Sequence, residues 1–136
     1  MKWKAFLTAA GAVYVVAQLV DYLIHGVLLR SAYEALKDLW RPDMASKTWI
    51  MVLVTAIWSV LFTLIFIKGY EARGWMEGVR FGLLIGLFTA IPLAYGTYAM
   101  LPIPYSLAFQ WFVSGLLQCI LLGIVAALVW GSLARR

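Results

Sequence analysis

The stretch from Phe81 to Ala134 contains no charged residue, and this feature constrains the fold more than any other. It is too long for one bilayer crossing, which takes about 20 residues of helix. Two prolines interrupt it in the segment Leu101-Pro102-Ile103-Pro104, and prolines spaced in this way mark a turn. We therefore predict two membrane-spanning helices in this stretch, over residues 81–100 and 107–130.

Two more apolar runs precede it. Residues 5–29 carry one charge, Asp21, and residues 48–67 carry none. The first run is longer than the apolar core of a signal peptide, so we expect it to be retained as a span. Only 12% of the chain is charged and 65% is hydrophobic, whereas soluble domains carry about 25% charged residues. These features exclude a water-soluble fold. They predict an all-α membrane protein, with four transmembrane helices in one antiparallel bundle over residues 1–136.

The basic residues predict how the bundle is oriented. Seven lie at the two termini and between the second and third spans: Lys2, Lys4, Lys68, Arg73, Arg80, Arg135 and Arg136. Four lie between the first and second spans: Arg30, Lys37, Arg41 and Lys47. Basic loops stay on the cytoplasmic side. We therefore expect both termini to be cytoplasmic, in the inner (plasma) membrane of a cell.

The first loop contains a candidate interfacial helix. Ser31 and Glu34 have the spacing of a capping box. Apolar side chains then recur on one helical face: Tyr33, Leu36 and Trp40. We predict a short amphipathic helix over residues 31–40 on the membrane surface. A plain extension of the first span is the alternative.

A stripe of polar residues runs along the first span. Tyr14, Gln18, Asp21 and His25 follow one another at steps of 4, 3 and 4 residues, which places them on one helical face. Asp21 and His25 are one turn apart and can pair directly. An ionisable residue within a span costs about 2.5–3.5 kcal/mol on insertion scales, so it suggests a binding site or proton relay. The alternative is a structural contact that holds this helix against its neighbours.

The other spans place polar residues at a similar depth. Counting 1.5 Å per residue from each span centre brings the following side chains to the level of Asp21 and His25: Thr55, Tyr95, Tyr98, Gln110 and Ser114. With Tyr14 and Gln18, we expect them to form a polar cluster in the outer half of the bilayer. Gln118 continues the same face of the fourth span. Gly82 and Gly86 form a GxxxG motif, which predicts close helix packing.

Little in the chain indicates catalysis. It has one cysteine, Cys119, and one histidine, His25, and no nucleophile, phosphate-loop or zinc motif. We expect no enzyme activity, no metal site and no cofactor. Haem would need His25 from two copies in an oligomer, or His25 with Met100 as the second axial ligand. The expected partners are the lipid bilayer, further copies of the chain or a larger membrane complex, and not nucleic acid.

Four segments of the sequence resemble corresponding segments of a known protein family. They are "DYLIHGVLL", "LWRP", "KGYEARGWMEGVRFGLLIGL" and "AYGTYAMLPIPYSLAFQW". Together they are similar to a group of small, uncharacterised four-span bacterial inner-membrane proteins, a family defined by a domain of unknown function. The resemblance implies a four-helix membrane fold and assigns no functional residues. The carboxylate in the first span is also similar to that of small multidrug resistance exporters, although those are shorter, use glutamate and lack the long outer loop.

Two functions are therefore compatible with the sequence. The first is a structural or accessory membrane protein, either a homo-oligomer or a subunit of a larger complex, in which the polar stripe serves packing. The second is a small proton-coupled transporter that uses Asp21 and His25. The first is favoured, because interhelical polar pairs commonly hold membrane helices together.

Overall fold

The computed structural model describes residues 1–135, and these form helices joined by short turns. Arg136, the last of the basic residues counted above, lies outside the described residues. In chain order the elements are α1 (Trp3–Asp21), the π-helix η1 (Tyr22–Leu28), α2 (Arg30–Ala35), the 3-10 helix η2 (Met44–Lys47), α3 (Thr48–Lys68), α4 (Trp75–Met100) and α5 (Tyr105–Ala134). The predicted all-α class is confirmed.

Four helical segments are long and apolar enough to cross a membrane, as predicted. They are Trp3–Leu28, Met44–Lys68, Trp75–Met100 and Tyr105–Ala134. The third begins well before residue 81. Its first turns include Glu77 and Arg80, and charged side chains at a helix end can reach the headgroup region without breaking the helix.

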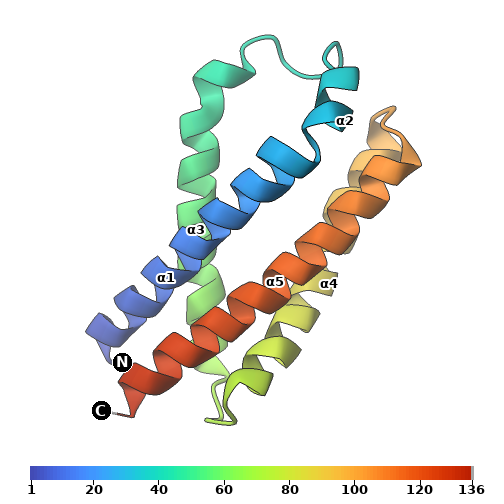
Figure 1. Ribbon diagram of the computed structural model, residues 1–136. Helices are drawn as coiled ribbons and strands as arrows, with labels where there is room; N and C mark the ends of the chain where they lie inside the picture. The colour runs from blue at the N-terminus through green and yellow to red at the C-terminus, as the bar shows by residue number, and fades with distance from the viewer. Residues whose placement is uncertain (136) are drawn as a thin grey trace.

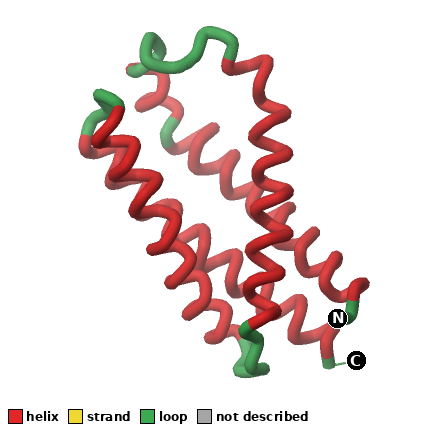
Figure 2. The backbone as a smooth tube through the Cα atoms, turned by 180° about the vertical axis from the view of Figure 1, so that it is seen from behind, coloured by secondary structure: helices red, strands yellow, loops and turns green. Residues whose placement is uncertain are grey.

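The helices alternate in direction, and both termini lie at one end of the bundle together with the turn between α3 and α4 (Figure 1). We call this the terminal end and the opposite end the distal end. α5 packs against both α4 and α1, and α3 packs on α1. Figures 1 and 2 both show α3 diverging from α4 toward the distal end.

Small residues bring α4 and α5 together. The buried face of α4 consists of Gly78, Gly82, Gly86, Ala90 and Ala94. A Cβ atom added at Gly82 would overlap the carbonyl oxygen of Cys119, and one added at Gly78 would overlap that of Gly123. Backbone therefore meets backbone along this interface, which is how membrane helices pack without a hydrophobic driving force.

Apolar side chains fill two further clusters. The larger one lies where α1, α3 and α5 meet near the terminal end, around Val13, Phe62 and Leu122. There Phe62 and Phe66 of α3 pack against Phe81 of α4, with ring centroids 4.8 and 5.3 Å apart. The smaller cluster lies at the distal end and contains Ile24, Leu29, Ile103, Leu107 and Ala108.

The predicted helix over residues 31–40 is wrong in extent. α2 ends at Ala35, and turns follow it. Its N-cap is Leu29, which makes no side-chain capping bond, and Glu34 pairs with Arg30 at 3.1 Å instead of reaching back to Ser31. The apolar residues of the predicted helix, Tyr33, Leu36 and Trp40, pack onto the smaller apolar cluster at the distal end. Because these side chains are used for packing within the protein, a location on the membrane surface is not confirmed.

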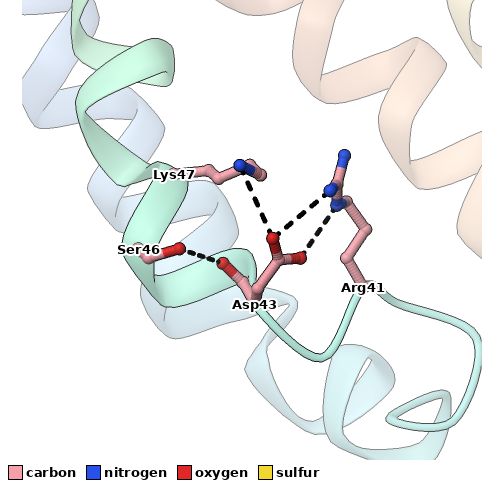
Figure 3. Close-up of polar contacts among 4 residues, drawn as sticks. All are labelled: Arg41, Asp43, Ser46 and Lys47. Atoms are coloured by element: carbon pink, nitrogen blue, oxygen red, sulfur yellow. Dashed lines mark hydrogen bonds and ion pairs between the residues drawn. The ribbon is translucent and has the colours of Figure 1, made fainter.

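The rest of the distal loop is held by local ion pairs (Figure 3). The Asp43 carboxylate accepts hydrogen bonds from Arg41 Nε and Nη2 at 3.0 and 3.3 Å, and Lys47 Nζ lies 3.5 Å away. Ser46 Oγ donates to the carbonyl oxygen of Asp43 at 2.7 Å. The hydrogen bond from Arg41 lowers the pKa of Asp43. Since these side chains are largely solvent-accessible, the pairs shape the entry to α3 but add little stability.

Candidate functional site

A cavity of about 260 Å³ lies among α1, α3, α4 and α5. Its polar lining includes Asp21, Thr55 and Gln118, and the indole rings of Trp58 and Trp111 form part of its wall. The rest of the lining is small or apolar: Ala17, Val54, Thr89, Ala90, Leu93, Gly115 and Cys119. A concave, mostly apolar space with a few polar groups is the usual form of a binding site.

The cavity opens sideways. Val54 of α3 and Leu93 of α4 line it, and they are 51% and 66% exposed on the outer surface of the bundle. α3 and α4 diverge toward the distal end (Figure 2), and the aromatic contacts between them lie toward the terminal end, at Phe81. The exposure of Val54 and Leu93 therefore indicates an opening on the flank of the bundle, between α3 and α4.

Asp21 is held by a residue from the other end of the chain. Gln118 Nε2 on α5 donates to Asp21 Oδ1 at 2.8 Å, and the two residues are 97 positions apart. Asp21 is the last residue of α1, and its side chain is half-buried. Over residues 1–135, no basic side chain forms an ion pair with it. The carboxylate thus has a hydrogen-bond donor and no counter-charge within the described part of the chain.

The predicted pairing of Asp21 with His25 does not form. From Tyr22 onward the helix changes to π geometry, and Leu29 N–H bonds the carbonyl of Ile24, five residues back, at 2.9 Å. No hydrogen bond or ion pair joins Asp21 to His25, and His25 Nδ1 instead contacts the Tyr33 hydroxyl of the distal loop.

Tyr33 is the centre of that second contact. Trp111 Nε1 donates to the Tyr33 hydroxyl oxygen at 2.7 Å, and this hydroxyl shares a hydrogen bond of 2.5 Å with His25 Nδ1. The His25 and Tyr33 rings stack with 16° between their planes. Trp40 Nε1 donates to the Tyr33 carbonyl at 3.1 Å. Burial raises the pKa of the Tyr33 phenol, although the bond from Trp111 opposes this. The network ties η1 and α2 to α5.

The other predicted cluster members lie in separate groups. Gln18 Nε2 donates to Tyr14 OH at 3.1 Å within α1. Tyr95 and Tyr98 gather around Tyr105, whose hydroxyl lies 3.2 Å from that of Tyr95. These groups do not line the cavity. Of the residues predicted from sequence, the structure therefore brings only Asp21 and Thr55 together at the cavity.

The last two polar residues of the predicted cluster, both on α5, do not reach it. The Ser114 hydroxyl donates to the Gln110 carbonyl of its own helix at 2.6 Å, and the Gln110 side chain is exposed. A serine that bonds back to its helix has no hydrogen left for a partner helix. The polar face of α5 therefore contributes Gln118 alone to the site, one turn beyond Ser114.

Sequence reasoning did not assign roles to Tyr33 and Trp111, and placed Gln118 only on a helical stripe. Tyr33 was assigned to a lipid-facing surface, because its apolar spacing matches an amphipathic helix. Trp111 gives no sequence signal of its own, because indoles near the ends of spans are common at membrane interfaces. The only sequence signal for Gln118 was an amide within an apolar span, since such a residue needs a protein partner.

Within residues 1–135, no group of three or more His, Cys, Asp and Glu side chains is placed to hold a metal ion. Met100 is 79% exposed at the end of α4. No family model, curated protein or solved structure matches this chain.

Proposed function

We propose that this chain is a small structural or accessory subunit of a membrane assembly, either a homo-oligomer or a larger complex. One observation carries the proposal: several polar side chains of the distal half are paired across elements of the chain. Asp21 bonds Gln118, and Tyr33 bonds both His25 and Trp111. Pairs of this kind hold helices together and contribute about 0.6 kcal/mol each on average, with a maximum of about 1.7 kcal/mol.

The pairs do not form a proton path. Asp21 and His25 make separate contacts on opposite sides of the change to π geometry. A further polar pair, Tyr14 with Gln18, stays within one helix. Relays in pumps and transporters use chains of ionisable groups that can exchange protons, and this arrangement favours a packing role.

The proposed location is the inner membrane, with both termini in the cytoplasm. Both termini lie at the same end as the turn between α3 and α4 (Figure 1). That end carries six of the ten basic residues in the described part of the chain, namely Lys2, Lys4, Lys68, Arg73, Arg80 and Arg135. An excess of Lys and Arg on short segments marks the cytoplasmic side.

The oligomeric state and its stability test this proposal. The purified chain in mild detergent should appear in native mass spectra as an oligomer or as a complex with another protein. We expect Asp21→Asn and His25→Gln to lower the thermal stability of that assembly. Proton flux in liposomes should stay at the level of empty vesicles for the native chain. A monomer that melts at the same temperature with and without the substitutions contradicts the proposal.

A small proton-coupled transporter is the second candidate, and one observation favours it. Asp21 lines a cavity, and an accessible carboxylate in a span is the usual coupling group of such carriers. In this case the substitutions leave the fold intact and abolish pH-dependent uptake. Because His25 is bonded to Tyr33, Asp21→Asn should then abolish uptake while His25→Gln only reduces it.

A further inference from the structure

No Lys or Arg in residues 1–135 forms an ion pair with the Asp21 carboxylate. The cavity that Asp21 lines has a volume of about 260 Å³, which is enough for a cationic side-chain end. Gln118 is the hydrogen-bond donor to this carboxylate from another helix, and it occupies Oδ1. Asp21 lies seven residues before the helical end at Leu28, in the distal half of the first span. Charged groups at such depths pair with one another or face a cavity. Asp21 lines the cavity, so a cation that enters the cavity at this depth would be placed to pair with it.

The walls of the cavity suit a cation on a long apolar stem. Trp58 and Trp111 present indole rings near Asp21, and indoles attract ammonium and guanidinium groups through their π-faces. The Trp111 ring is held by its bond to Tyr33, and Trp58 stacks on Phe62 with centroids 4.6 Å apart. The rest of the lining is mostly apolar, so methylene groups would pack against it. A lysine or arginine side chain has both features.

The mouth determines where that side chain comes from. Val54 and Leu93 line the cavity and are exposed, which places the mouth on the flank of the bundle between α3 and α4. The flank of a membrane-spanning bundle faces lipid. A side chain entering there must belong to a helix that lies in the membrane against α3 and α4. A second copy of this chain does not supply one at this depth, because the basic residues of its spans lie in their first or last turns: Lys4, Lys47, Lys68 and Arg80.

We propose that the gap between α3 and α4 receives a transmembrane helix of a different protein, whose Lys or Arg enters the cavity and pairs with Asp21. This inference rests on the proposed role as an accessory subunit, and it specifies a hetero-complex with a partner that carries one basic residue in the distal half of a span. Such a residue is costly in lipid alone. The pairing therefore makes association selective for partners that carry it.

A designed peptide tests the proposal without knowledge of the natural partner. The peptide is a helix of about 20 Leu and Ala residues, with one Lys about 10 Å from an end of its apolar segment. Its matched control carries Met instead of Lys. Energy transfer between the labelled peptide and the full-length chain is measured in phosphatidylcholine vesicles. We expect the native chain to bind the Lys peptide at least tenfold more tightly than the Met peptide.

Variants of the chain identify the group responsible. Asp21→Asn keeps an oxygen for Gln118 but removes the charge, so the preference for Lys should fall below twofold. Asp43→Asn removes a carboxylate from the exposed distal loop (Figure 3) and should leave the preference unchanged. Asp21→Lys should instead prefer a peptide that carries Asp. Val54→Trp narrows the mouth at a lipid-facing position and should weaken binding even if Asp21→Asn fails to fold.

Three results overturn the proposal. The first is equal binding of the Lys and Met peptides to the native chain. The second is a Lys preference that persists in Asp21→Asn. The third is Asp21-dependent binding of benzyltrimethylammonium without binding of the Lys peptide, which would assign the cavity to a small ligand. The mass and melting measurements of the proposed function do not depend on the peptide, so its failure and the failure of that proposal are distinguishable.

Discussion

The close contact between α4 and α5 predicts how much stability the protein loses when a methyl group is added at Gly82. Gly82→Ala adds one methyl group where a Cβ atom would overlap the Cys119 carbonyl oxygen and lie 2.5 Å from Ile120 Cα. Carbon atoms in contact prefer about 3.5–4.0 Å, so the helices must separate by about 1 Å. Because both obstacles are backbone atoms, no side chain can move aside. We expect the substitution to lower the free energy of unfolding by about 1–3 kcal/mol, the usual cost of overpacking.

The same helix provides a matched control. Gly96 is also within α4, and no heavy atom lies within 4 Å of a Cβ added there. Gly96→Ala should be neutral, or more stable by up to about 1 kcal/mol through helix propensity. Both variants can be unfolded with sodium dodecyl sulfate in mixed micelles and followed by circular dichroism. If the two agree within about 0.5 kcal/mol, the close packing of α4 on α5 is refuted.

Three more outcomes follow from the polar contacts. Gln118→Leu leaves Asp21 without its donor and should lower the free energy of unfolding by about 1–2 kcal/mol. Gln110→Leu, at an exposed position of the same helix, should leave the free energy of unfolding unchanged. Equal losses in the two variants would contradict the role of Gln118 as the donor to Asp21. Burial raises the folded-state pKa of Tyr33. The stability this gives is therefore complete below the unfolded pKa of 10.0 and is lost as pH rises through the folded value. Tyr33→Phe should remove this loss of stability at alkaline pH, measured as the melting temperature against pH. If the native chain and the variant show the same pH dependence, Tyr33 is not the group responsible. Glu77 accepts backbone N–H bonds from the turn before α4, at 2.6 and 2.9 Å. Glu77→Ala should therefore speed hydrogen exchange over residues 71–73, whereas unchanged exchange would show that the turn is held otherwise.

Much of the architecture follows from composition along the chain. A helix in lipid must satisfy its own backbone hydrogen bonds, so every uninterrupted apolar run of sufficient length becomes a span. This is why the four spans and the proline turn at residues 101–104 are readable in the sequence. The spacing of Gly82 and Gly86 also marks a face that approaches another helix, although the sequence does not name that helix as α5.

The site was less predictable, because its partners are distant in sequence. Helical periodicity placed Asp21 on the correct face of the first span, but it assumed a regular α-helix as far as His25. The π-helix from Tyr22 to Leu28 breaks that assumption. In the structure His25 contacts Tyr33, and Asp21 contacts Gln118. No local pattern encodes this choice, since it depends on what α5 offers at that depth.

The sequence by itself therefore determined the membrane character of the helices, the number of spans and the position of Asp21 well inside the first of them. Each of these follows from local composition and the cost of polar groups in lipid. Only the tertiary structure decided which groups meet. The packing of α5 between α1 and α4 positions Gln118 and Trp111, and the divergence of α3 from α4 opens the cavity beside Asp21 (Figure 2). Helix packing angles are set by side chains from all four spans together, and no single span contains that information.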